Sequence, residues 1–201
     1  TCVARKRSSV RSRLAPPLAK VIEKVIMKNS ISLIGMAGAG KSSIGERLSK
    51  HLKLNFVDSD SLIEEKFGKS LQDILNNNGN EKFNEIEEGV LLSVKFKKIV
   101  LATGGSAVFC KKAMEYIKEN STVIYLEVPF DDISTRISDF SERGLIKRSD
   151  QTIKEAYKDR EGLYQKYADY IVKNNGIIDS CLNKIINLIK DLSRNNNGLR
   201  T

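Results

Sequence analysis

One stretch limits the possible folds of this chain more than any other, the segment GMAGAGKS at residues 35–42. It matches the pattern G-x-x-x-x-G-K-[ST] of a phosphate-binding loop, whose backbone N–H groups surround phosphate oxygens at the start of a helix. The β-branched run Ser30–Gly35 predicts a buried strand before the loop, and Ile44, Leu48 and Leu52 recur after it at helical spacing. We therefore predict a strand, a polyphosphate-binding loop and a helix, in that order.

The residue types in the loop predict how it binds a nucleotide. Its glycines let successive N–H groups turn inward, the Lys41 ammonium can reach the β- and γ-phosphates, and the Ser42 hydroxyl can bind Mg²⁺. The expected ATP-binding residues are Gly38, Ala39, Gly40, Lys41, Ser42 and Ser43. The alternative is a glycine-rich turn with an exposed lysine, but a chance match to both glycines and the Lys-Ser pair at a strand–helix junction is improbable.

Strands and helices alternate along the rest of the chain. Short apolar runs predict strands at 54–57, 98–103, 122–126 and 170–172. Helical spacing predicts helices at 62–75, 83–94, 111–118, 152–167 and 182–192. The first is expected to break near Gly68, and a polar turn at 76–80 is expected before the second. Residues 139–150 are expected to form a mobile surface segment. This order is typical of the α/β class, here a three-layer α/β/α fold with a five-stranded parallel sheet and a mobile lid.

Composition restricts the partners and the domain boundaries. The chain has 201 residues, enough for one well-buried core, and a net charge of +9. Residues 1–26 hold seven basic residues and one acidic residue, so this leader carries most of that charge and the body is close to balanced. We expect a disordered leader at 1–26, transit-like or mistranslated, a phosphate-loop domain at 27–193 and a frayed tail at 194–201.

The same composition gives little support for other kinds of partner. No apolar run approaches the ~20 residues that span a bilayer, and Cys2, Cys110 and Cys181 lack the spacing of a zinc or redox site. The lone His51 is expected at the surface. We predict a monomer with a small-molecule substrate, without nucleic acid or membrane, in the cytoplasm, or in a plastid or other organelle if the leader is a transit peptide.

Chain size and a second motif narrow the class of phosphate-loop protein. A chain of this length has no room for the further domains of a motor, and no N-K-x-D guanine-reading motif stands in a suitable place. Asp58 and Asp60 leave the end of the second predicted strand, where two carboxylates can meet a metal ion and a nucleophilic hydroxyl together. Taken without the loop, the same pair could be a helix N-cap and a first-turn acid.

The segment FVDSD at 56–60, together with the phosphate loop, resembles the shikimate kinase family. Further likeness covers residues 30–192 in four stretches: GNEKFNEIE at 79–87, ATGGS at 102–106, RGLI at 143–146 and REGLYQKYAD at 160–169. The resemblance implies ATP-dependent phosphorylation of the shikimate 3-hydroxyl, with Mg²⁺ at Ser42 and Asp58. By the same resemblance Asp60 would be the base, Gly104 and Gly105 would line the substrate, Arg143 would close over ATP phosphates, and Arg160 would pair with the substrate carboxylate.

Two departures from the family pattern lie on the substrate side. Asn84 stands where the family has an arginine that helps to hold the shikimate carboxylate, and Ser106 stands where the family has a third glycine. An amide cannot reproduce the bidentate, charged arginine fork. Glu87 is then expected to lack its partner, and Asn84 and Glu87 would contact an acceptor with an amine or more hydroxyls. The alternatives to shikimate kinase are therefore a kinase of such a metabolite and a non-catalytic nucleotide-binding protein.

Overall fold

The computed structural model describes residues 28–137, 146, 150–174 and 176–197. Within these residues, five strands form one sheet in which every pairing is parallel and the order is β2-β3-β1-β4-β5. The strands are β1 (Ile31–Ile34), β2 (Asn55–Asp58), β3 (Ile99–Ala102), β4 (Thr122–Glu127) and β5 (Tyr170–Lys173). The predicted α/β class and five-stranded parallel sheet are confirmed.

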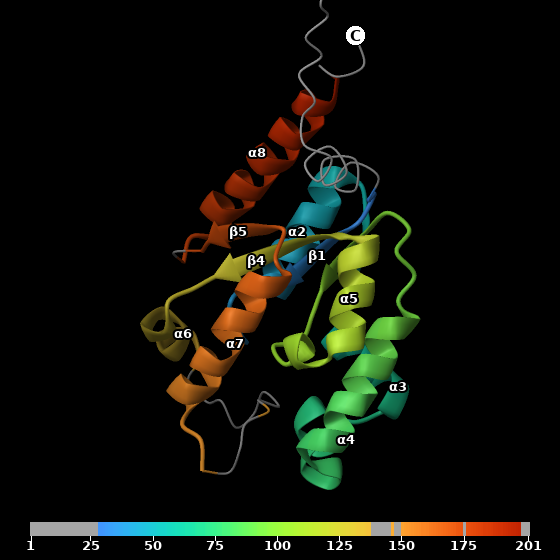
Figure 1. Cartoon of the computed structure of the whole chain (residues 1–201), viewed down its shortest axis with the longest axis vertical. Coiled ribbons are helices and arrows are strands. Elements are labelled where there is room, and N and C mark those ends of the chain that lie inside the picture. The colour runs from blue at the N-terminus through green and yellow to red at the C-terminus, as the bar shows by residue number, and fades with distance from the viewer. Residues whose placement is uncertain (1–27, 138–145, 147–149, 175, 198–201) are drawn as a thin grey trace, which may run out of the picture.

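Helices connect the strands and cover both faces of the sheet (Figure 1). They are α2 (Lys41–Leu52), α3 (Ser59–Phe67), α4 (Leu71–Ser93), η1 (Ala107–Phe109, a 3₁₀ turn), α5 (Lys111–Asn120), α6 (Phe130–Arg136), α7 (Ile153–Tyr167) and α8 (Ile178–Asn197). α2 and α8 pack against each other on one face, and α5 and α7 lie on the other. The result is the three-layer arrangement that alternating strands and helices predict.

Burial on both faces explains why the central strands are continuous apolar runs. Leu33 and Ile34 of β1 and Val123 and Ile124 of β4 are fully buried, as is usual in parallel sheets with helices on each side. β1 lies between β3 and β4, with Ile31 in register with Val100 and Thr122. The chain therefore crosses to opposite sides of β1, and ligands of open α/β sheets bind at the carboxyl ends of the strands near such a point.

The structure departs from the predicted elements in three places. The predicted polar turn at residues 76–80 is confirmed only at Gly79, whose φ of 74° and ψ of 174° make a kink between two helical segments of α4; Asn76, Asn77 and Asn78 are helical. The helix α6 and the turn η1 were not predicted, since each is too short to show a full apolar period. The last helix begins earlier and ends later than predicted, at Ile178 and Asn197.

Several expectations fall outside this part of the chain. The leader and Arg143 lie outside the described residues, as does most of the predicted surface segment 139–150. His51 is exposed, as expected, and Cys110 and Cys181 are buried free thiols. None of the helices in the described ranges is long and apolar enough to cross a membrane.

Candidate active site

The loop between β1 and α2 has the backbone conformation of an anion-binding turn. Gly38 and Gly40 have φ values of 77° and 87°, in the left-handed region that glycine enters without steric cost. Gly40 is the N-cap of α2, so the free N–H groups of the first helical turn face the loop. The Asn174 amide, just after β5, donates a 2.9 Å hydrogen bond to the Ala39 carbonyl and holds the loop from behind.

Lys41 bends back over this loop. Its ammonium donates hydrogen bonds to the Gly35 and Met36 carbonyls, at 2.8 and 2.9 Å, and its side chain is largely buried. The ammonium group thus lies beside the N-terminus of α2, where two sources of positive potential coincide. This is where the β- and γ-phosphates of a bound triphosphate would lie.

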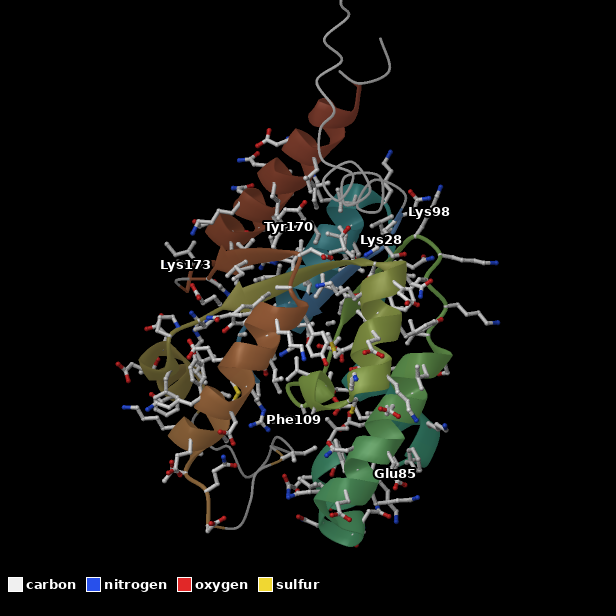
Figure 2. The ribbon with its side chains drawn as sticks, in the orientation of Figure 1. Lys28, Glu85, Lys98, Phe109, Tyr170 and Lys173 are labelled. Atoms are coloured by element: carbon white, nitrogen blue, oxygen red, sulfur yellow. The ribbon has the colours of Figure 1, made fainter. Side chains whose placement is uncertain are left out.

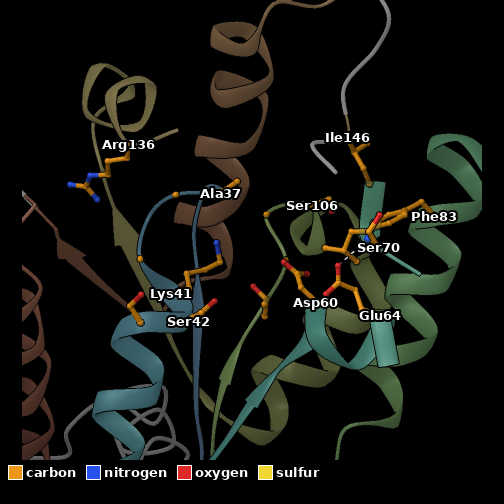
Figure 3. Close-up of a pocket in the computed structure, with 17 residues that line it drawn as sticks. Ala37, Lys41, Ser42, Asp60, Glu64, Ser70, Phe83, Ser106, Arg136 and Ile146 are labelled. Atoms are coloured by element: carbon orange, nitrogen blue, oxygen red, sulfur yellow. Dashed lines mark hydrogen bonds between the residues drawn. The ribbon is translucent and has the colours of Figure 1, made fainter. Parts of the chain in front are cut away.

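The loop opens into a cavity of about 480 Å³ with two chemically different sides. One side carries the loop residues Ala37, Lys41 and Ser42 together with Arg136 of α6 (Figure 3). The other side carries Asp60, Glu64, Ser70, Phe83, Ser106 and Ile146. Leu71, Thr103, Gly104 and Gly105 complete the lining, and Gly105 lies next to Ala37. Gly38, Gly40 and Ser43 also line the cavity, whereas Ala39 is fully buried beneath it.

The two predicted carboxylates occupy different positions. Asp58 caps α3, its carboxylate accepting a hydrogen bond from the Asp60 N–H at 3.0 Å, and it does not line the cavity. Asp60 lines the cavity across from Lys41. Burial raises the pKa of Asp60 to about 6, with Lys41 opposing the shift and the Asp58 charge adding to it. Asp60 therefore has the pKa of a group that can accept a proton near neutral pH.

The glycines after β3 bring backbone close to both carboxyl groups of the site. The Ser59 hydroxyl accepts a hydrogen bond from the Gly104 N–H at 2.9 Å, and the Tyr164 hydroxyl donates to the Gly105 carbonyl at 2.7 Å. A Cβ at Gly104 would lie 2.3 Å from a Glu87 oxygen and 2.7 Å from an Asp60 oxygen. A side chain at position 104 would therefore displace the Glu87 and Asp60 carboxyl groups from their present positions.

The expectation that Glu87 lacks a partner is wrong. The Ser106 hydroxyl donates a hydrogen bond to Glu87 Oε2 at 2.7 Å, and both side chains are buried. Burial nevertheless raises the pKa of Glu87 to about 8; Ser106 and Arg160 lower it, and the Asp60 charge raises it further. The two departures from the family pattern, Asn84 and Ser106, therefore meet at one place in the fold. Ser106 donates a hydrogen bond to Glu87, which lies one turn after Asn84 on α4.

Arg160 is more enclosed than expected. It is 1% exposed, it donates hydrogen bonds to the Ala156 and Ile146 carbonyls, and its guanidinium lies 4.8 Å from the centre of the Phe109 ring. Phe109 lies beside α7 (Figure 2). Arg160 Nε and Asn84 Oδ1 are buried without a hydrogen-bond partner among the described residues. Neither residue lines the cavity, and nor does Glu87; all three lie behind its wall.

Two residues of the site were missed by sequence reasoning. Arg136, at the end of α6, lines the nucleotide side of the cavity and donates a 3.0 Å hydrogen bond to the Asn174 carbonyl. Asn174 in turn holds the phosphate loop. An arginine at the end of an unrecognised short helix and an asparagine just after a short strand belong to no motif, so only their spatial position identifies them.

The donor set fits a magnesium ion that arrives with a nucleotide. Mg²⁺ prefers oxygen ligands and keeps several waters, so it usually takes one or two protein oxygens together with phosphate oxygens. The Ser42 hydroxyl and the Asp60 carboxylate both face the cavity. Asp58 adds negative charge directly behind them. Anion-binding backbone, a buried ammonium, a hard-cation ligand set and a titratable carboxyl thus converge on one cavity, which suits phosphoryl transfer.

Comparison with known proteins gives a consistent result. A family model described as shikimate kinase matches residues 37–190. Among curated proteins, a shikimate kinase of Clostridium botulinum (strain Alaska E43 / Type E3) is 40% identical over 164 residues, which is 81% of this chain and 98% of that protein. One from Francisella tularensis subsp. novicida is 37% identical over 166 residues, 80% of this chain and 94% of that protein.

Solved structures are similar over the same region. Shikimate kinase from Acinetobacter baumannii in complex with shikimate superposes with a TM-score of 0.74 at 31% identity and covers 85% of this chain and 97% of its own. Shikimate kinase from Aquifex aeolicus superposes with a TM-score of 0.70 at 30% identity and covers 80% and 96%.

Proposed function

The chain belongs to the shikimate kinase family, and from that premise we propose that it transfers the γ-phosphoryl group of ATP to the 3-hydroxyl of shikimate. Like its family, it is a small-molecule kinase that uses ATP and Mg²⁺. The observation that carries the proposal for this chain is the position of Asp60, across one cavity from Lys41 and the phosphate loop. A nucleophilic hydroxyl can lie between the carboxylate and the phosphate site only in such an arrangement.

The reaction needs one bond made and one broken. The acceptor oxygen attacks the γ-phosphorus, the bond from that phosphorus to the bridging oxygen of ADP breaks, and the hydroxyl proton passes to the Asp60 carboxylate. Lys41 and the N–H groups of the loop stabilise the charge on the transferring phosphoryl group. Ser42, with Asp58 in support, would hold Mg²⁺, which would supply neutralisation of phosphate charge when bound with ATP.

The remaining residues serve binding rather than proton transfer. Gly104 and Gly105 let the acceptor approach the strand ends. Arg160, buried behind the cavity wall as Asn84 and Glu87 are, supplies from there the positive charge that attracts the shikimate carboxylate. Arg143, outside the described residues, is proposed to close over the ATP phosphates, as a positive group near the transferring phosphoryl does in many kinases. Arg136 is proposed to contribute to the nucleotide side as well, because it lines that part of the cavity.

The assay that tests this function measures ADP release from ATP and Mg²⁺ as shikimate is added. We expect a saturable, shikimate-dependent rate, with the product identified as the 3-phosphate by phosphorus NMR. Lys41→Ala should lower kcat at least about 100-fold, the usual effect of removing one group that stabilises transition-state charge, while the circular dichroism spectrum stays unchanged. Lys50→Ala, an exposed lysine later in α2 that pairs with Glu46, is the matched control.

Two other outcomes would lead to different conclusions. Turnover with an amine-bearing or more highly hydroxylated acid, but not with shikimate, would reassign the acceptor. Nucleotide binding without turnover on any acceptor would leave a non-catalytic binding protein. We further propose that the enzyme is a cytoplasmic monomer. We also propose that it has no nucleic-acid partner, since the body of the chain is close to charge balance. Size-exclusion chromatography with light scattering tests the monomer directly.

A further inference from the structure

A buried carboxyl group lies directly behind the acceptor side of the cavity. Glu87 is 1% exposed, and no ion pair to it is found within the described residues. The Ser106 hydroxyl, 2.7 Å from Glu87 Oε2, is the one side-chain donor that the structure gives it there. A buried carboxyl group that is not ion-paired depends on its hydrogen bonds for its orientation and its ionisation.

The other oxygen of this carboxyl group lies close to Asp60. Glu87 Oε1 and Asp60 Oδ1 are 2.3 and 2.7 Å from the same point, the position of a Cβ on Gly104, so they are at most about 5 Å apart. Gly104, Ser106 and Asp60 all line the cavity, and Glu87 is packed behind them. A small rotation of the Glu87 carboxyl group would therefore move the wall that an acceptor contacts.

The arginine nearest to this carboxyl group does not replace the serine. Within the described residues Arg160 forms no ion pair with Glu87, and its N–H groups donate to the Ala156 and Ile146 carbonyls instead. Asn84 is one turn from Glu87 on α4, so the two side chains share a helix face, but its buried Oδ1 is an acceptor without a donor among the described residues. Neither neighbour holds Glu87 in place by a hydrogen bond that the structure shows.

We propose that Ser106 is a positioning residue, whose hydroxyl holds the Glu87 carboxyl group behind Gly104 and Asp60 and thereby sets the shape and charge of the acceptor side. The expected effect on shikimate binding rests on the proposed function. The orientation of the Glu87 carboxyl group by Ser106 rests on the geometry alone. Ser106 acts through Glu87 and is not itself required for transfer, so its loss should affect acceptor binding more than the chemical step.

The surroundings of Glu87 show what its loss would change. The groups that interact with it electrostatically come from four parts of the fold, namely Asp60 of α3, Lys41 of α2, Arg160 and Tyr164 of α7, and Cys110 after η1. Among them Asp60 raises the pKa of Glu87, whereas Ser106, Arg160 and Lys41 lower it. Removing the serine hydroxyl should therefore raise the pKa of Glu87 further.

The first experiment is Ser106→Ala in the full chain. Loss of an ordinary hydrogen bond typically corresponds to a change of about 5-fold in an equilibrium constant, so we expect the KM for shikimate to rise by about that factor. The KM for ATP should stay within about twofold, since the nucleotide side is untouched. Ser106→Thr keeps the hydroxyl and should restore acceptor binding. Ser49→Ala, which removes another buried serine hydroxyl far from the cavity, is the matched control.

A double-mutant cycle tests the link to Glu87. Glu87→Met removes the acceptor oxygens and keeps an unbranched side chain of similar length. In the Glu87→Met background Ser106→Ala should change the KM for shikimate by less than about twofold, because residues that act through one another are not additive. Equal effects of Ser106→Ala in both backgrounds would overturn the proposal.

A carbon-13 NMR titration of the glutamate side-chain carboxyl groups separates this inference from the proposed function. We expect the Glu87 resonance, assigned by its loss in Glu87→Met, to titrate at higher pH in Ser106→Ala than in the wild-type chain. An unchanged titration midpoint would overturn the positioning role even if shikimate is phosphorylated. If the wild-type chain does not phosphorylate shikimate, the proposed function fails, and the titration still decides the role of Ser106.

Discussion

Replacing Glu87 by glutamine should stabilise the protein, and the gain should increase with pH. Burial raises the pKa of Glu87 from 4.5 to about 8. Below pH 4.5 the folded and unfolded chains both hold this proton, so it contributes no pH dependence. Between pH 4.5 and 8 the unfolded chain releases the proton and the folded chain keeps it, so raising the pH favours unfolding of the wild-type chain. Above pH 8 the difference levels off.

The size of the effect follows from the shift. One pKa unit corresponds to about 1.4 kcal/mol, so by pH 7 the wild-type chain should have lost about 3 kcal/mol of unfolding free energy relative to Glu87→Gln. For a domain of this size that corresponds to a difference in Tm of about 6–12 °C. Glutamine stays neutral at every pH and can still accept the hydrogen bond from Ser106.

Urea unfolding followed by circular dichroism at pH values from 5 to 8.5 measures this difference. Glu85→Gln on the same helix is the control, since Glu85 is exposed and pairs only with Lys82 at the surface; its effect should stay within about 0.5 kcal/mol at each pH. The reasoning is refuted if the wild-type and Glu87→Gln curves differ by a constant amount from pH 5 to pH 8.

Three further predictions concern the cavity itself. Gly104→Ala should lower kcat/KM at least about tenfold, because the added Cβ would meet the Glu87 and Asp60 carboxyl groups at 2.3 and 2.7 Å; wild-type kinetics would contradict this. Gly38→Ala should weaken ATP binding in calorimetry, since its φ of 77° disfavours a side chain and the Cβ would lie 2.8 Å from Ile137; unchanged affinity would count against the loop geometry. The pKa of Asp60, raised to about 6, should make kcat/KM fall tenfold per pH unit below that value, and a profile flat to pH 5 would remove Asp60 as the base.

Local patterns were sufficient to predict the fold. The strand before the phosphate loop, the helix after it and the later apolar runs each show their period within a few residues, so the five strands could be predicted without tertiary information. The elements that were missed or wrong lack such a signal. α6 has seven residues. The asparagines before Gly79 favour a turn locally, but they are helical, and Asn76 and Asn78 form side-chain hydrogen bonds with Gln72 and with the Ile74 carbonyl of the same helix.

The residues of the candidate site likewise fall into those that a local motif predicts and those that only the folded structure brings together. Lys41, Ser42 and Asp60 were found because they belong to compact motifs, and each lines the cavity. The partner of Glu87 could not be predicted, because Ser106 lies 19 residues further on and reaches Glu87 only through the packing of α4 against η1. Likewise, no spacing rule indicates that Phe109 covers Arg160 or that Arg136 lines the nucleotide side.

The most direct test of the whole account is isothermal titration calorimetry with a non-hydrolysable ATP analogue and Mg²⁺. The loop geometry predicts one nucleotide bound per chain, with binding that is strongly weakened in Lys41→Ala and unaffected in Lys50→Ala. An absence of measurable binding by the wild-type chain, with Mg²⁺ present and the fold intact, would contradict the assignment of this cavity to phosphoryl transfer.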